Sequence, residues 1–199
     1  MKDKSHKFNE TYFERAVSHY RTYKDMKLME KAYFPRFILH ENIPPNSRVL
    51  DVGCAFGYFL KLCADYRLET YGLDISEYAI EKAKLYLHDV NEGLQIFQDE
   101  FFDFVTMFDI IEHVKSPCDL LMEVHRVLKR GAKIVITTPN VNAIAKLLKG
   151  KQWVGFSDPT HLYLFTSDSL KFLVEKNGFI VKVRNDFSSL PRVLAKDFK

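Results

Sequence analysis

From Arg48 onward, short apolar runs alternate with amphipathic stretches, and this alternation limits the possible folds more than any other feature of the chain. Continuous apolar strands separated by amphipathic helices are typical of a parallel sheet that is covered on both faces. We therefore predict an α/β fold with a Rossmann-like, doubly wound, mostly parallel sheet. The predicted strands are Arg48–Val52, Thr70–Asp74, Phe102–Phe108, Lys133–Thr138 and Phe179–Val183, with a weaker one at Leu87–Val90 or Leu94–Phe97.

Helix signals lie between these strands. Serines, one of them followed by proline, stand at typical helix starts, and glycines stand at typical helix ends. The sequence leaves open whether a seventh strand near Pro191–Ala195 is present. The predicted helices run from Gly57 to about Asp65, from Ser76 with Ala79, Ile80, Ala83 and Leu87 on one face, from Ser116-Pro117 to Gly131, and from Ser167 to Asn177 before Gly178.

The first part of the chain is rich in aromatic and charged residues and lacks the alternation of a strand. It predicts two helices, Asn9–Lys24 and Leu28–Glu41, which end before Pro44-Pro45. We assign residues 1–45 to an N-terminal helical lid and residues 46–199 to a ligand-binding domain. Residues 1–40 hold nine Lys and Arg against five Asp and Glu. This excess predicts either a solvated helical surface or a lid that attracts an anionic acceptor.

The first predicted strand runs directly into a glycine-bearing turn, Gly53 to Gly57, and then into a helix. Glycines suit places where the backbone takes positive φ or passes close to a ligand. The spacing G-x-x-x-G differs from the dinucleotide fingerprint. Asp51 at the strand end would repel a pyrophosphate, whereas it suits a cationic amino group. Asp74 ends the second strand, where a carboxylate can accept both ribose hydroxyls, so it indicates an adenosine ligand without naming it.

At these residues the sequence resembles the class I S-adenosylmethionine-dependent methyltransferases, especially the small-molecule branch with ubiquinone-biosynthesis and sugar or natural-product enzymes. Asp51–Gly57 is similar to their D-x-G-x-G-x-G motif, with Ala55 where the middle glycine is usual, and we expect this alanine to be a mild change if its φ is negative. Tyr71–Ser76 resembles their ribose-binding strand end. The most specific match is Phe102–Val114, followed by Arg126–Gly131 and Thr137–Asn140.

The resemblance implies a class I methyltransferase fold, with S-adenosyl-L-methionine as cofactor and S-adenosyl-L-homocysteine as product. It also implies that Asp89 and Val90 meet the adenine and that Met107 and Phe108 border the methionine end of the cofactor. Residues 46–199 then form the S-adenosylmethionine-binding domain. The expected cofactor-binding residues are Asp51, Gly53, Cys54, Ala55, Phe56, Gly57, Asp74, Ile75, Asp89, Val90, Met107 and Phe108.

Methyl transfer from a sulfonium needs alignment of the acceptor and exclusion of water more than it needs protein chemistry. A hydroxyl acceptor also has to lose a proton, and our ranked candidates for removing it are His161, His113 and Asp109. Each histidine has a structural alternative, in which it only tethers a loop by hydrogen bonding. Trp153 is either a loop anchor or an acceptor contact. No set of Asp, Asn and Glu ligands stands out, so we expect no metal.

The composition bounds the partners. A net charge of +3 is too small to indicate nucleic acid. No apolar run is long enough to span a bilayer, so we expect no membrane contact. The three cysteines have no spacing typical of disulfide pairs or of a metal site, so we expect a cytoplasmic protein. We expect a monomer or homodimer. The predicted function is methyl transfer to an O or N atom of a small molecule. The alternatives are a nucleic-acid or protein methyltransferase, a non-catalytic S-adenosylmethionine-binding module, and a dehydrogenase.

Overall fold

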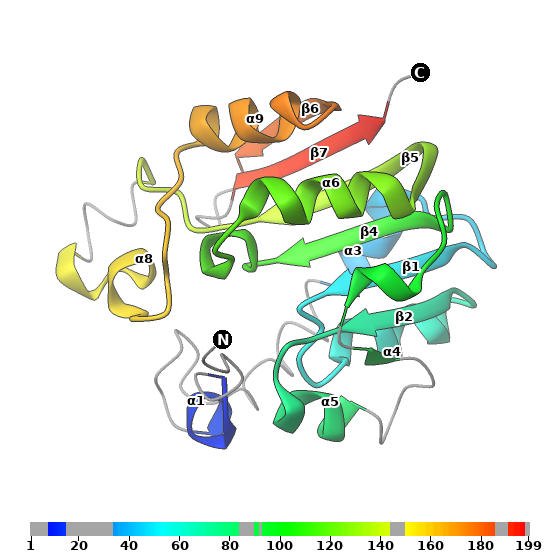
Figure 1. Ribbon diagram of the computed structural model, residues 1–199, viewed down its shortest axis with the longest axis horizontal. Coiled ribbons are helices and arrows are strands. Elements are labelled where there is room, and N and C mark those ends of the chain that lie inside the picture. The colour runs from blue at the N-terminus through cyan, green and yellow to red at the C-terminus, as the bar shows by residue number, and fades with distance from the viewer. Residues whose placement is uncertain are drawn as a thin grey trace. The chain divides into compact units, whose positions relative to one another are not determined.

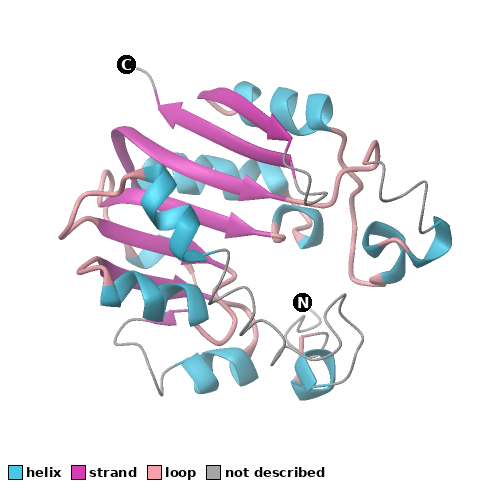
Figure 2. Ribbon diagram, turned by 180° about the vertical axis from the view of Figure 1, so that it is seen from behind, coloured by secondary structure: helices cyan, strands magenta, loops and turns pink. Residues whose placement is uncertain are grey.

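The computed structural model describes residues 8–14, 34–83, 90–91, 93–143, 150–185 and 191–197. The chain divides into two compact units, Met1–Gly93 and Leu94–Lys199, and strands alternate with helices along most of both (Figures 1 and 2). Among the described residues, no helix has the length and apolar character needed to cross a membrane. The first unit holds α1 (Glu10–Glu14), α3 (Phe34–Glu41), β1 (Arg48–Val52), α4 (Tyr58–Asp65), β2 (Glu69–Leu73), α5 (Glu77–Ala83) and β3 (Val90–Asn91).

The sheet of the first unit is parallel and has the order β3-β2-β1. Val49 and Leu50 of β1 are fully buried, as expected for a strand that is covered on both faces. Helix α4 packs on β1 and β2 and buries Phe59, Leu60 and Cys63. The parallel pairing brings the carboxyl ends of β1 and β2 side by side, at Val52 and Leu73.

The second unit holds the other four strands that the structure describes, in the order β4-β5-β7-β6. β4 and β5 are parallel, whereas β7 is antiparallel to both β5 and β6. Helix α6 lies alongside β4 and β5 in Figure 1, and α9 packs on β6 and β7. The elements are η3 (Leu94–Ile96), β4 (Phe102–Phe108), η4 (Ile111–His113), α6 (Pro117–Val127), β5 (Leu128–Thr137), η5 (Gly150–Gln152), α8 (Val154–Ser157), α9 (Ser167–Lys176), β6 (Phe179–Asn185) and β7 (Pro191–Asp197).

Most predicted elements are confirmed, and two are corrected. Leu94–Ile96 is a turn of 3-10 helix, so the third strand is not there but at Val90–Asn91. Gly131 does not end a helix: α6 ends at Val127 and the next residue already begins β5. The φ of 72° at Gly131 lies in the part of β5 where its register with β4 shifts, so this glycine serves an irregularity of the strand.

Three other expectations concern the last strand, the N-terminal helices and the helix start at Ser76. The strand left open near Pro191–Ala195 is present as β7. Of the two N-terminal helices, the structure describes Glu10–Glu14 and Phe34–Glu41, and residues 15–33 lie outside the described residues, as does Leu87. Ser76 is confirmed as a helix start, because its hydroxyl accepts the backbone N–H of Ala79 at 3.1 Å. The lid boundary at residue 45 stays a prediction.

Candidate functional site

The turn after β1 is held against the end of β2 by backbone hydrogen bonds. The N–H groups of Gly53 and Cys54 both donate to the carbonyl oxygen of Leu73, at 2.7 and 2.9 Å. Gly53 and Gly57 have φ values of 79° and 71°, in the left-handed region that glycine enters without steric cost. Both glycines therefore shape this turn, and its role in binding a ligand stays a prediction.

Ala55, at the middle of this turn, has a φ of 46°. Our expectation of a mild replacement required a negative φ, so that expectation is wrong. The left-handed region costs a residue with a Cβ roughly 1–2 kcal/mol. The N–H of Ala55 donates to Asp74 Oδ2 at 2.9 Å, and this bond holds the residue in its strained conformation.

Asp74 follows β2 and connects two loops. Its Oδ2 accepts from Ala55, and its Oδ1 accepts the backbone N–H of Ser76 at 2.8 Å. A carboxylate has about four acceptor sites, more than the backbone N–H groups that it contacts here, so it can also accept a ribose hydroxyl. Burial raises the pKa of Asp74, and the N–H groups of Ser76, Ala55 and Ile75 oppose this rise. Ile75 beside it is 54% exposed and offers an apolar surface to a flat base.

Other predicted residues of the first unit are buried around this turn. Asp51 lies within β1 and is buried. Cys54 is also buried, and burial raises the pKa of its thiol, which fits a small packing residue rather than a reactive one. Val90 pairs with Gly72 as part of β3, whereas Asp89 lies outside the described residues.

Aromatic residues of the N-terminal segment pack on the turn. The ring of Phe13 in α1 lies 5.1 Å from the ring of Phe56, and both belong to a buried cluster with Ala55 and Ala79. The Ser76 hydroxyl donates to the carbonyl oxygen of Phe8. Residues 8–14 thus cover one side of the turn, as the lid prediction requires of this part of the chain.

In the second unit, polar residues gather where β4 ends. Asp109 follows the strand with a φ of 54°, and its Oδ1 accepts the Thr137 hydroxyl at 3.1 Å. Burial raises the pKa of Asp109 to about 6, against the hydrogen bond from Thr137 and the attraction of His161. The side chain of Met107 is fully buried, which leaves only its backbone for a ligand, while Phe108 is half-buried.

Glu112 is a functional candidate that the sequence analysis missed. Its side chain is 1% exposed, and among the described residues neither carboxylate oxygen has a hydrogen-bond partner. Burial raises the pKa of Glu112, as does the nearby charge of Asp109. The Thr138 hydroxyl opposes this rise but does not meet hydrogen-bond geometry. A buried carboxyl group without a partner is rare and costly. In the sequence, the sign that Glu112 is buried is its position directly after two isoleucines.

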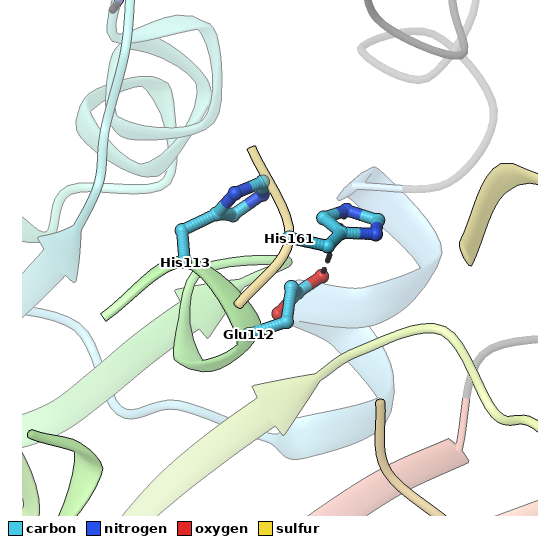
Figure 3. A group of neighbouring side chains, drawn as sticks. All are labelled: Glu112, His113 and His161. Atoms are coloured by element: carbon cyan, nitrogen blue, oxygen red, sulfur yellow. Dashed lines mark ion pairs between the residues drawn. The ribbon is translucent and has the colours of Figure 1, made fainter. Parts of the chain in front are cut away.

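Two histidines lie beside Glu112 (Figure 3). His161 Nε2 is 4.0 Å from Glu112 Oε1, and the rings of His113 and His161 are 4.7 Å apart. His161 Nδ1 bonds the carbonyl oxygen of Gly155 at 3.1 Å. Burial lowers the pKa of His113 to about 4, helped by His161, so His113 is neutral at physiological pH.

A second buried carboxylate, Asp158, supports His113 through Thr160. Asp158 Oδ1 accepts the backbone N–H of Thr160 at 2.8 Å and its hydroxyl at 2.5 Å. The same hydroxyl lies 2.9 Å from His113 Nδ1. Both histidines thus have the tethering hydrogen bonds of the structural alternative. Trp153 is 1% exposed, as expected of a loop anchor.

Comparison with known proteins identifies the family. A family model described as a methyltransferase domain matches residues 20–182. The ubiquinone biosynthesis O-methyltransferase of Roseobacter denitrificans is 29% identical over 157 residues, which are 67% of this chain and 63% of that protein. The enzyme of the same name from Thiobacillus denitrificans is 30% identical over 113 residues, 52% of this chain and 49% of the other. The chain thus spans about half to just under two thirds of these two relatives.

Solved structures agree with this result. An S-adenosylmethionine-dependent methyltransferase from Archaeoglobus fulgidus has a TM-score of 0.71 at 24% identity, covering 86% of this chain and 94% of that one. A Pyrococcus horikoshii protein has a TM-score of 0.71 at 20% identity, covering 94% and 96%. The predicted fold class is confirmed, and the dehydrogenase alternative is left without support. The chain belongs to the methyltransferase-domain family of S-adenosylmethionine-dependent enzymes and has their class I fold.

Proposed function

We propose that this chain transfers the methyl group of S-adenosylmethionine to an oxygen or nitrogen atom of a small-molecule acceptor. The observation that carries the proposal is the double role of Asp74, which fixes the turn through Ala55 and retains acceptor capacity for a ribose hydroxyl. The relatives named as ubiquinone biosynthesis O-methyltransferases support a small-molecule acceptor and an oxygen atom as its methylated group.

The residues of the first unit fit the cofactor. The positive φ values of Gly53 and Gly57 hold the backbone in a turn that leaves little side chain in the way of a ligand. Asp74 would bind the ribose hydroxyls, Ile75 would lie against the adenine, and Asp51 would attract the amino group. When bound, the cofactor supplies the methyl group as an activated electrophile.

The second unit supplies groups that can take a proton from an acceptor hydroxyl. His113 is neutral at physiological pH because burial lowers its pKa to about 4, and His161 has its Nδ1 bonded to a carbonyl oxygen. A neutral imidazole can accept a proton at its unprotonated nitrogen. Asp109, whose pKa is raised to about 6, is a further base, so all three predicted proton acceptors remain candidates.

A turnover assay tests this proposal. The full chain is incubated with methyl-labelled S-adenosylmethionine and panels of phenols, hydroxy acids and amines, and S-adenosylhomocysteine is measured with and without each compound. We expect product that depends on one class of compound, with Asp74→Asn lowering the rate at subsaturating cofactor. Turnover that needs protein or nucleic acid, or tight cofactor binding without turnover on any panel, would contradict the proposal and favour the corresponding alternative.

A further inference from the structure

We propose that the N-terminal strap, residues 8–14, holds Asp74 in position for the cofactor, so that docking of the strap and binding of S-adenosylmethionine strengthen each other. Phe13 and Ser76 are then positioning residues, which act on the cofactor through Asp74. This role rests on the S-adenosylmethionine binding of the proposed function and is independent of the acceptor. The strap and its partners all belong to the first unit, where α1 packs beside α5 (Figure 1).

Backbone N–H groups from two loops hold the carboxylate of Asp74. Oδ2 accepts the N–H of Ala55 at 2.9 Å, and Oδ1 accepts the N–H of Ser76 at 2.8 Å. A carboxylate that is already fixed in the orientation needed by the ribose loses little conformational entropy when the ligand binds. The contacts that hold Ala55 and Ser76 in place therefore contribute to the affinity for the cofactor.

The strap is attached first to Ser76. The Ser76 hydroxyl donates its one proton to the carbonyl oxygen of Phe8 and accepts the N–H of Ala79 at 3.1 Å. Ser76 is fully buried. The residue thus joins three parts of the unit: its hydroxyl bonds the strap and begins α5, and its backbone N–H bonds Asp74.

The strap is attached a second time at the turn after β1. The ring of Phe13 lies 5.1 Å from the ring of Phe56, and both rings share a buried cluster with Ala55 and Ala79. The φ of 46° at Ala55 is unfavourable for a residue with a Cβ and persists only where the surroundings enforce it. The strap is part of these surroundings, so it supports both residues that donate to Asp74.

The strap depends on these contacts for its own structure. Asn9 Oδ1 accepts the N–H of Tyr12 at 3.2 Å, and the carbonyl oxygen of Asn9 accepts the N–H of Phe13 at 3.3 Å. Helix α1 has five residues, far fewer than an isolated helix needs to be stable in water. A small gain in binding energy at the turn therefore shifts the docking of the whole strap.

Phe13 acts through the turn and not by touching the cofactor. Its side chain is 5% exposed, so little of the ring is left to contact a ligand. Coupling between two binding events typically changes affinities by roughly 5–150-fold, and it is reciprocal. If the docked strap raises the affinity for the cofactor, the bound cofactor has to stabilise the docked strap by the same factor.

Amide hydrogen exchange of the full chain, free and with saturating S-adenosylhomocysteine, tests the coupling without an acceptor. We expect the N–H groups of Tyr12 and Phe13 to exchange at least ~5-fold more slowly in the complex. In the free chain, Asp74→Asn should speed their exchange, because it weakens the bonds to Ala55 and Ser76. Asp119→Asn, in the second unit, should leave it unchanged.

Two variants of the strap contacts test the effect on affinity. Ser76→Ala keeps the backbone N–H that Asp74 accepts but loses the donor to Phe8. Phe13→Ala changes no atom of Asp74 or Ser76. Each should weaken S-adenosylhomocysteine binding by about 5–10-fold in calorimetry. Because both act by undocking the same strap, the double variant should lose less than the product of the two effects.

Thr166→Ala is the matched control for Ser76→Ala, because it removes the capping hydroxyl of α9 in the second unit. It should lower the thermal midpoint without changing the affinity for S-adenosylhomocysteine. Phe13→Leu, which keeps a buried apolar side chain, covers the case in which Phe13→Ala does not fold and should give a smaller effect in the same direction.

The outcomes separate this coupling from methyl transfer itself. Bound S-adenosylhomocysteine that leaves exchange in the strap unchanged, or affinities that do not differ between the strap variants and Thr166→Ala, would overturn the coupling even if the chain methylates an acceptor. Slower exchange and the expected losses of affinity, in a chain that shows no turnover, would contradict the proposed function alone. Absence of S-adenosylhomocysteine binding would overturn both.

Discussion

Asp74 accepts the backbone N–H of Ala55 through Oδ2 at 2.9 Å, although the two residues are 19 positions apart. The bond ties the strained middle of the turn after β1 to the end of β2. The same carboxylate accepts the N–H of Ser76 through Oδ1, so one side chain sets the shape of both loops on which the proposed cofactor site depends.

Asp74→Asn should weaken S-adenosylmethionine binding by about 10–100-fold, since an amide nitrogen cannot accept the bonds that one carboxylate oxygen accepts now, and a lost charged hydrogen bond costs roughly 1.5–3 kcal/mol. Calorimetric titration measures this change. Asp119→Asn, in the first turn of α6, removes one carboxylate charge from an exposed position and serves as the control. Equal binding by the two variants would contradict the role of Asp74.

Gly72→Ala should lower the free energy of unfolding by about 1–3 kcal/mol through overpacking. A Cβ at this position would lie 2.7 Å from Cys54 Sγ and 2.8 Å from Leu60 Cδ1. Urea unfolding measures the loss, and Cys54→Ala in the same chain should restore part of it by removing one of the two clashes. If the double variant were less stable than both single variants combined, the close packing of the turn on β2 would be refuted.

Lowering the pH from 7 to 5 should cost on the order of 1–2 kcal/mol of stability through His113. Burial lowers the pKa of His113 from 6.5 to about 4, so between these values the unfolded chain binds a proton that the folded chain does not. Stability through this group is therefore complete above about pH 6.5 and falls as the pH drops toward 4.

Urea unfolding at pH 7 and pH 5, with His113→Gln as the comparison, isolates this contribution from that of Asp109, whose raised pKa acts in the opposite direction. The variant should lose less stability than the unmodified chain over the same interval. An NMR titration that placed the pKa of His113 near 6.5 would disprove the burial effect directly.

Phe13→Ala should destabilise the N-terminal segment by roughly 2–4 kcal/mol, because a buried aromatic ring that packs on Phe56 is lost. We expect faster amide hydrogen exchange in α1 and weaker cofactor binding, while exchange in β4 stays unchanged. Leu39→Ala, at a position that is 66% exposed, is the control. Unchanged exchange in α1 would show that this contact does not hold the segment in place.

The sequence predicted the fold well where local signals and burial agree. β4 was predicted with its observed ends, because five of its seven residues are apolar and most of these five are buried. The predicted helix end at Gly131 was wrong, although a glycine after an amphipathic stretch is typical of a helix end. The backbone N–H of Phe101 donates to the carbonyl oxygen of Val127, and β5 begins at the next residue. Such a tertiary hydrogen bond leaves no trace in the local sequence.

The candidate site was predictable only in part, for the same reason. Asp51, Asp74 and the glycines lie at strand ends, and the topology of a parallel sheet brings strand ends together. The φ of Ala55 and the grouping of Glu112 with His161 depend on contacts between segments 19 and 49 residues apart. No pattern within a single segment encodes either relationship.

Calorimetric titration of the purified chain with S-adenosylmethionine and S-adenosylhomocysteine, with NAD as the control ligand, tests the central assignment most directly. The predicted result is micromolar or tighter binding of both compounds at one site per chain and no binding of NAD. A preference for NAD, or no binding of either sulfur compound by folded protein, would contradict the assignment of the turn at Gly53–Gly57 and Asp74 as an S-adenosylmethionine site.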